Sequence, residues 1–137
     1  MPGPSDAETL VAGYYAAFNA GDRPAMLALL TDDVIHDINQ GAREVGKPAF
    51  AAFLTHMDLC YRERLLDIVI MLSADGTRAA AEFFVEGEYI ETDGGMSPAH
   101  GQRYRLPAGT FFEIRDGRIA RVTTHYNMKG WIAQLGG

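Results

Sequence analysis

The chain has 137 residues, close to the usual size of one compact domain, and its 47% apolar residues can build a sizeable core. A net charge of −6 with scattered Lys and Arg residues argues against nucleic acid as a partner. There is no apolar run of about 18 residues to span a bilayer, no signal-peptide pattern, and only one cysteine, Cys60, so no internal disulfide. We expect a single cytoplasmic domain over residues 1–137.

Three helices are predicted in the first sixty residues. An amphipathic helix ending near residue 19 is predicted by apolar residues at helical spacing, namely Ala7, Leu10, Val11, Tyr14 and Phe18. Ser5 and Glu8 have the spacing of a capping box at its start. A second helix is predicted after Asp22, with Pro24 in its first turn. The third presents Phe50, Phe53, Leu54 and Met57 on one face.

Strands are predicted before and after the third helix. Residues 29–37 form an apolar strand, and residues 39–48 are expected to be a loop. Residues 62–72, 79–89, 102–114 and 118–128 predict a meander, with hairpin turns at Asp75-Gly76 and Asp116-Gly117. Residues 79–89 alternate as in a strand with one face towards water, and a short helix around Trp131 is expected after the last strand. Pro107 and Gly109 suggest a bulge or a sharp bend. This order of elements predicts an α+β domain with helices on one face of a curved sheet.

His36 and Asp37 stand next to each other in the first strand. Because strand side chains alternate, only one of them can point into the core, and the neighbouring residues do not decide which. An inward Asp37 would be a carboxylate of raised pKa, suited to moving a proton at carbon. An inward His36 would offer an imidazole of pKa near 6.5, an acid or base for cyclisation or dehydration.

Three stretches of the chain resemble a known superfamily. Residues 14–37 (YYAAFNAGDRPAMLALLTDDVIHD), the meander, and residues 111–127 (FFEIRDGRIARVTTHYN) resemble the nuclear transport factor 2-like superfamily, in its SnoaL-like and steroid Δ-isomerase-related branch. The resemblance extends from about residue 8 to residue 132. It implies a cone-shaped mixed sheet of about four to five long strands, wrapped by three N-terminal helices around an apolar pocket. Enzymes of several kinds and non-catalytic binders share this fold.

The resemblance also implies roles for individual residues. Tyr14 matches the tyrosine with which ketosteroid isomerases hold the substrate oxyanion. The pair His36-Asp37 matches their polar residue and carboxylate base, which favours Asp37 as the base. The spacing is one residue shorter here, however, and an ungapped count places Asp37 on the outward face. Thr110 stands where the isomerases carry a protonated carboxylic acid, and Tyr126 is expected on the pocket wall.

We therefore expect a steroid Δ-isomerase-like enzyme, without a cofactor, that moves a proton alpha to a carbonyl of a hydrophobic small molecule. Asp37 would be the base and Tyr14 the oxyanion donor. The substrate-binding wall would comprise Thr110, Tyr126, Phe18, Phe53, Met57, Phe83 and Phe112. The alternatives are a non-catalytic ligand-binding domain and a SnoaL-like cyclase, dehydratase or hydrolase that uses His36.

Two further expectations concern partners and metals. Residues 65–72 are apolar on both faces, so both faces should be covered, either by the same chain or by a second copy in a homodimer. The four histidines (His36, His56, His100 and His125) are not spaced i, i+4 with one another, and no CxxC motif accompanies them. We therefore expect no metal site.

Overall fold

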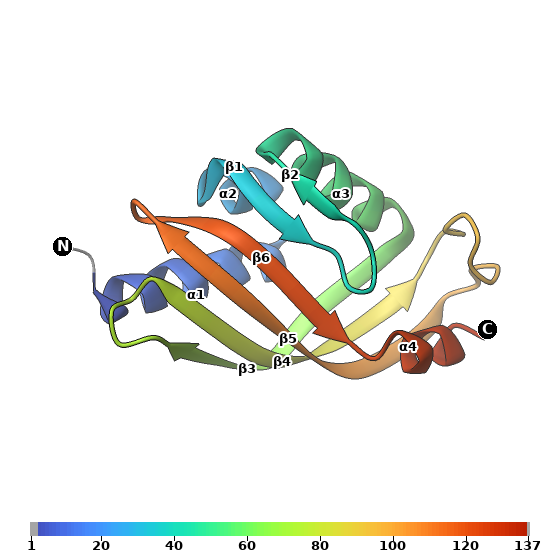
Figure 1. Cartoon of the computed structure of the whole chain (residues 1–137). Coiled ribbons are helices and arrows are strands. Elements are labelled where there is room, and N and C mark those ends of the chain that lie inside the picture. Colours follow the sequence, from blue (N-terminus) through green and yellow to red (C-terminus); the bar gives the residue numbers. More distant parts are fainter. Residues whose placement is uncertain (1–2, 137) are drawn as a thin grey trace.

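The computed structural model describes residues 3–136, which form one curved sheet with helices packed against it (Figure 1). The elements in chain order are α1 (Pro4–Ala20), α2 (Arg23–Ala28), β1 (Leu30–Asp37), β2 (Arg43–Val45), α3 (Lys47–Cys60), β3 (Tyr61–Leu72), β4 (Arg78–Tyr89), β5 (Gln102–Arg115), β6 (Arg118–Tyr126) and α4 (Met128–Gln134). The strand order is β2-β1-β6-β5-β4-β3. The strands β3 to β6 pair antiparallel and β1 runs parallel to β6, which confirms the predicted mixed α+β fold.

The sheet has more strands than predicted, because residues 43–45 form β2 rather than part of a loop. This strand pairs with Ile35, His36 and Asp37 of β1. Three residues are too few to show the alternation of a strand, so the sequence carried no signal for it. The three N-terminal helices are confirmed, and the short terminal helix expected around Trp131 is α4.

Local signals set the ends of the first two helices. Helix α1 starts at Pro4 with Gly3 as its N-cap, and the Gly3 N–H donates to Asp6 Oδ2 at 3.0 Å, so the predicted Ser5–Glu8 capping box is wrong. At the other end Gly21, with φ of +69°, ends the helix in a left-handed conformation. The next residue, Asp22, caps α2 by accepting from the backbone N–H of Ala25 at 3.1 Å.

The predicted alternation of β4 is confirmed, since Ala79, Ala81, Phe83 and Tyr89 are buried. Of the bulge or sharp bend predicted at Pro107 and Gly109, the bulge is wrong, because both residues pair with β4 in continuous register. Pro107 precedes the first residue of β5 that pairs with β6, so its missing N–H costs no hydrogen bond on that side. The sheet is instead irregular in β3 between Leu66 and Val69 and near the end of β5.

The core consists of two clusters. The larger one lies between the helices α1 to α3 and the sheet, and the smaller one packs under α4 and includes Cys60, Tyr61, Tyr89, Tyr104, Leu106, Trp131 and Leu135. No helix among residues 3–136 is long and apolar enough to cross a lipid bilayer.

Candidate active site in the cavity

A cavity of about 160 Å³ lies between α1, α3 and the inner face of the sheet. Aromatic and aliphatic side chains make up most of its wall. The residues expected there from the sequence that do line it are Phe18, Phe53, Met57, Phe83, Thr110 and Tyr126. Phe112 does not line the cavity. It is fully buried beneath it, with its ring 5.9 Å from the rings of both Tyr14 and Tyr15.

Asp37 points away from the cavity, so its expected position in the pocket is wrong. Its Oδ1 accepts from Arg43 Nε at 2.6 Å and its Oδ2 accepts from the Thr123 hydroxyl at 2.6 Å. The hydrogen bond from Arg43 is the main reason that the pKa of this carboxyl falls to about 2. The cause lies in the pairing of β1, which places Asp37 opposite Arg43 on one side and Thr123 on the other. An ionised, paired carboxylate on the outer face cannot take a proton from a ligand in the cavity.

His36 is the member of the pair that faces the cavity. It is 7% exposed and its ring lies 4.6 Å from the rings of both Phe50 and Phe53. Burial lowers its pKa to about 4, and the charge of Asp37 only partly opposes this. The imidazole is therefore neutral near pH 7. Its buried Nδ1 has no hydrogen-bond partner within residues 3–136.

Two adjacent tyrosines of α1 bring hydroxyl groups to the same cavity. Tyr14 is 5% exposed and Tyr15 4%, and both line the cavity. Burial raises the pKa of both phenols, so they stay protonated and can donate. The Tyr15 hydroxyl is buried and lacks a hydrogen-bond partner in the described part of the chain. Thr110 partly opposes the rise in the pKa of Tyr15. The Oγ1 atom of Thr110 lies 3.4 Å from Thr124 Oγ1.

Glu63 is a cavity residue that the sequence analysis missed. It lines the cavity from β3, and its Oε2 accepts a hydrogen bond of 2.5 Å from the Tyr104 hydroxyl. Burial raises the pKa of this carboxyl although the hydrogen bond opposes the shift. Alternation with Tyr61 and Leu65 was the available signal, because all three share one face of β3. This alternation was not recognised, because residues 65–72, which follow, are apolar on both faces of the strand.

An ion pair lies where the cavity reaches the surface. The Arg23 Nη2 and Nε atoms bind the two carboxylate oxygens of Asp58 at 2.6 and 2.9 Å. The guanidinium also lies over the ring of Phe18, 4.9 Å from its centroid. Both charged residues line the cavity, and the Asp58 side chain is 44% exposed. The cavity therefore opens beside this pair.

Known proteins share this architecture closely. The family described as SnoaL-like domain matches residues 11–122. A structure described as a putative polyketide cyclase, from Pseudomonas putida KT2440, is 62% identical, with 94% of this chain and 97% of that chain covered and a TM-score of 0.93. A structure with the same description from Xanthomonas campestris pv. campestris is 54% identical, with 96% and 98% covered and a TM-score of 0.95.

A more distant structure shows the breadth of the fold. An NTF2-like protein from Burkholderia pseudomallei K96243 is 18% identical, with 96% of this chain and 98% of that chain covered and a TM-score of 0.78. No curated protein matches the chain. The likeness at this identity is one of fold alone, and it confirms the nuclear transport factor 2-like architecture. With its family match over residues 11–122 and this fold, the chain belongs to the SnoaL-like domain family.

Proposed function

We propose that this protein is an enzyme that moves a proton on a hydrophobic, carbonyl-bearing small molecule, with His36 as the proton acceptor. The observation that carries the proposal is the neutral imidazole of His36, which lies between two phenylalanine rings in a mostly apolar cavity. Close relatives described as putative polyketide cyclases favour a polyketide-like substrate. The proposed base is thus His36 and not its neighbour Asp37, which the resemblance to isomerases favoured.

The proposed reaction is ring closure through an enolate. His36 takes a proton from a carbon flanked by carbonyl groups, the resulting enolate carbon bonds to a second carbonyl carbon, and the new alkoxide takes up a proton. An imidazole of pKa about 4 is a weak base. The imidazolium and the enolate that form together attract each other strongly in a dry site, which offsets this weakness.

Hydroxyl donors support the same reaction. The protonated phenols of Tyr14 and Tyr15, with the Thr110 hydroxyl, would donate to the oxygen that becomes negative. Glu63, whose pKa is raised, would serve as the second proton carrier, with Tyr104 holding its orientation. Acid and base would then come from well-separated strands, since His36 lies on β1, Glu63 lies on β3, and β6, β5 and β4 lie between these strands.

The size of the cavity bears on the substrate. Pockets that hold drug-sized ligands typically enclose roughly 300–1,000 Å³, whereas this cavity encloses about 160 Å³. A four-ring steroid would have to project past Arg23 and Asp58 or displace side chains. A smaller or partly protruding ligand fits better, so the steroid Δ-isomerase hypothesis loses support.

The test compares variants of His36, which faces the cavity, and of Asp37, which points away from it. A linear aromatic polyketone is incubated with wild type, His36→Gln and Asp37→Asn, and ring closure is followed by absorbance, with a Δ5-3-ketosteroid in parallel. We expect turnover by wild type and Asp37→Asn and a loss of about 100-fold or more in His36→Gln. Full activity of a folded His36→Gln variant would overturn the role of His36.

A non-catalytic binding domain is the second candidate. The observation in its favour is that a neutral histidine between two phenylalanine rings also makes a plain apolar wall. Ligand-induced quenching of the single tryptophan, Trp131, which lines the cavity, reports binding without turnover. Saturable quenching by the polyketone together with no ring closure above buffer would favour this candidate over the enzyme.

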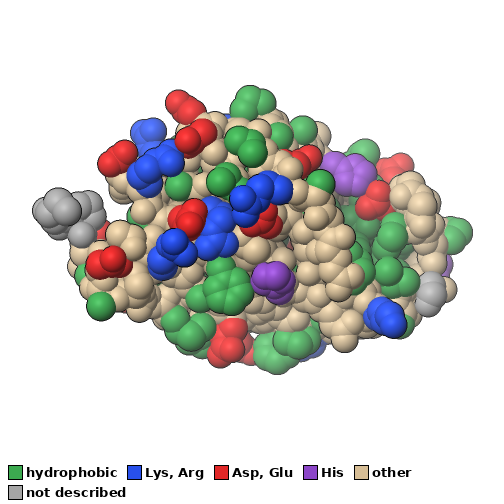
Figure 2. Space-filling view, in the orientation of Figure 1, with side chains coloured by type: hydrophobic (Ala, Val, Ile, Leu, Met, Phe, Trp, Pro, Cys, Tyr) green, Lys and Arg blue, Asp and Glu red, His purple; other side chains and the backbone are tan. Residues whose placement is uncertain are grey.

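We also propose that the protein pairs with a second copy through the outer face of the sheet. In the orientation of Figures 1 and 2 the helices α1 and α3 lie behind the sheet, and Figure 2 shows hydrophobic side chains beside charged ones on this face. The large apolar residues exposed there are Val69 (49%), Met71 (47%), Phe84 (36%) and Phe111 (49%). The register places Met71 and Phe111 on either side of Ala80, so they form one continuous surface.

A further inference from the structure

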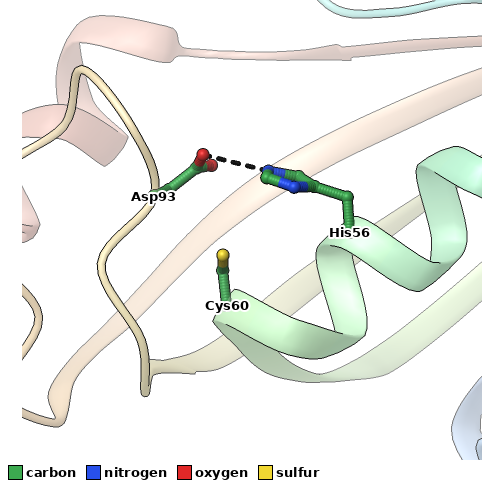
Figure 3. Close-up of side chains that lie close together, drawn as sticks. All are labelled: His56, Cys60 and Asp93. Carbon is green, nitrogen blue, oxygen red and sulfur yellow. Dashed lines mark hydrogen bonds and ion pairs between the residues drawn. The ribbon is translucent and has the colours of Figure 1, made fainter.

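Three side chains of metal-binding type meet where α3 joins β3, outside the cavity (Figure 3). His56 and Cys60 are four residues apart on α3 and so lie on one face of it, one turn apart. Asp93 comes from the loop after β4. One ligand atom of each residue lies within 4.8 Å of the others, and His56 Nε2 is 2.9 Å from Asp93 Oδ1. None of the three lines the cavity.

Asp93 is held in place by groups that do not belong to the cluster. Its backbone N–H donates to the Tyr89 hydroxyl at 2.8 Å, and that hydroxyl donates to the carbonyl of Ser97 at 2.7 Å. The Tyr61 hydroxyl donates to Asp93 Oδ2 at 2.8 Å. This leaves Oδ1 directed at His56. Hydrogen bonds to the second oxygen of a carboxylate are how proteins orient metal ligands.

Cys60 is the third member of the cluster. It is 2% exposed, and its sulfur points toward Asp93 (Figure 3). The Asp93 carboxylate lies within 4.8 Å of this sulfur. A thiolate and a carboxylate together carry the charge that one divalent cation neutralises.

We propose that His56, Cys60 and Asp93 bind one transition-metal ion of the Zn²⁺ class. Sulfur and imidazole ligands favour Zn²⁺ or Co²⁺ over Mg²⁺ or Ca²⁺, which take oxygen ligands. The ligand atoms of a tetrahedral zinc lie about 3.3–3.7 Å apart, so the side chains need shift by only about 1 Å. The His56 side chain is 53% exposed, so the ion enters from solvent and water takes the fourth position.

The bound ion would tie the end of α3 to the loop between β4 and β5. It would take the place of the hydrogen bond between His56 Nε2 and Asp93 Oδ1. Tyr61 also lines the cavity, so one hydroxyl would connect the metal site to the cavity wall. The proposal does not depend on the reaction proposed for His36, because the two sites share no residue.

The test is cobalt binding by the full chain after treatment with a chelator. One equivalent of Co²⁺ should produce a thiolate-to-cobalt charge-transfer band in the near ultraviolet, and Zn²⁺ should abolish it by displacement. Cys60→Ala should lose the band. His56→Gln and Asp93→Asn should weaken Co²⁺ binding at least about tenfold. His100→Gln, an exposed histidine that lies outside the cluster, should bind as wild type does.

His56→Gln guards against misfolding as an explanation, because its side chain is half exposed and its loss leaves the core intact. Its circular dichroism spectrum should match that of wild type while cobalt binding falls. No charge-transfer band at one equivalent would overturn the site. A band that survives in both His56→Gln and Asp93→Asn at wild-type affinity would also overturn it, because it would show a thiol binding cobalt alone.

Discussion

The side chain of Tyr104 extends over Gly87 to form a hydrogen bond with Glu63. Strands β3 and β5 both pair with β4, and the register places Glu63 and Tyr104 on either side of Gly87. A Cβ on Gly87 would lie 2.1 Å from Tyr104 Cζ, so any side chain there would occupy the space of the phenol ring. The missing side chain allows the Tyr104 hydroxyl to donate to Glu63 Oε2 at 2.5 Å.

Gly87→Ala should therefore reduce the free energy of unfolding by about 1–3 kcal/mol, because the ring of Tyr104 must move out of its packed position. Urea unfolding measures the change. Gly94→Ala is the matched control, since a Cβ there would meet no atom of residues 3–136 within 4 Å. In a Tyr104→Ala background the cost of Gly87→Ala should largely disappear. The same cost in both backgrounds would rule out the clash as its origin.

The stability of the protein should fall on acidification through the titration of His36. Its pKa is about 4 in the folded state against an ordinary value of 6.5, so the unfolded chain binds more protons between these values. The stabilisation is complete above pH 6.5 and is lost as the pH falls to about 4. Its size is at most about 3 kcal/mol.

Urea unfolding of wild type and His36→Gln at several pH values measures this effect. The slope of stability against pH between 4 and 6.5 should be smaller in the variant. His100→Gln, which removes an exposed histidine of the loop between β4 and β5, is the control. An imidazole resonance of His36 that titrates near pH 6.5 in the folded protein would contradict the prediction.

Asp37→Asn should leave turnover intact and lower stability modestly, by about 1 kcal/mol or less, since its partner Arg43 is largely exposed. The contribution of the carboxylate is present above its ordinary pKa of 3.8 and is lost as the pH falls through about 2. Unfolding at pH 7 and an activity assay on the same sample measure both effects. A tenfold loss of activity in the folded variant would return Asp37 to the list of catalytic candidates.

Charges on the outer face of the sheet should separate the proposed dimer. Phe84→Asp combined with Phe111→Asp places carboxylates in the apolar surface and should yield monomers in sedimentation velocity. Leu59→Asp is the control, because Leu59 is 58% exposed on α3, away from this surface. A wild-type protein that sediments as a monomer at high concentration would refute the pairing.

The sequence predicted the elements well where a local rule decides them. Alternation identified β4, the Asp116-Gly117 turn joins β5 to β6 with both residues at positive φ, and Asp22 caps α2. The orientation of His36 and Asp37 had no such rule, because both faces of β1 looked alike. Pairing with β6, which sets His36 opposite Val122 and Asp37 opposite Thr123, decides it. The shortened spacing relative to the isomerases was the one local hint.

Contacts between distant segments explain what the sequence did not reveal. Glu63 gains its place in the cavity from Tyr104 on another strand, and Asp93 joins His56 and Cys60 from a loop. Neither contact can be predicted from the spacing of apolar residues along the sequence. Both depend on the register of β4 with its neighbours, which is fixed only once the sheet has formed.

The position of β1 in the sheet also constrains the order of assembly. This strand carries His36 and precedes β2 to β5, yet its long neighbour β6 follows them in the chain and is synthesised after them. On the ribosome, β3, β4 and β5 can form hairpins as they emerge, whereas β1 has only the three-residue β2 to pair with. The cavity wall therefore closes late, and a nascent chain that stalls before residue 118 leaves β1 with an open edge for other chains to pair with.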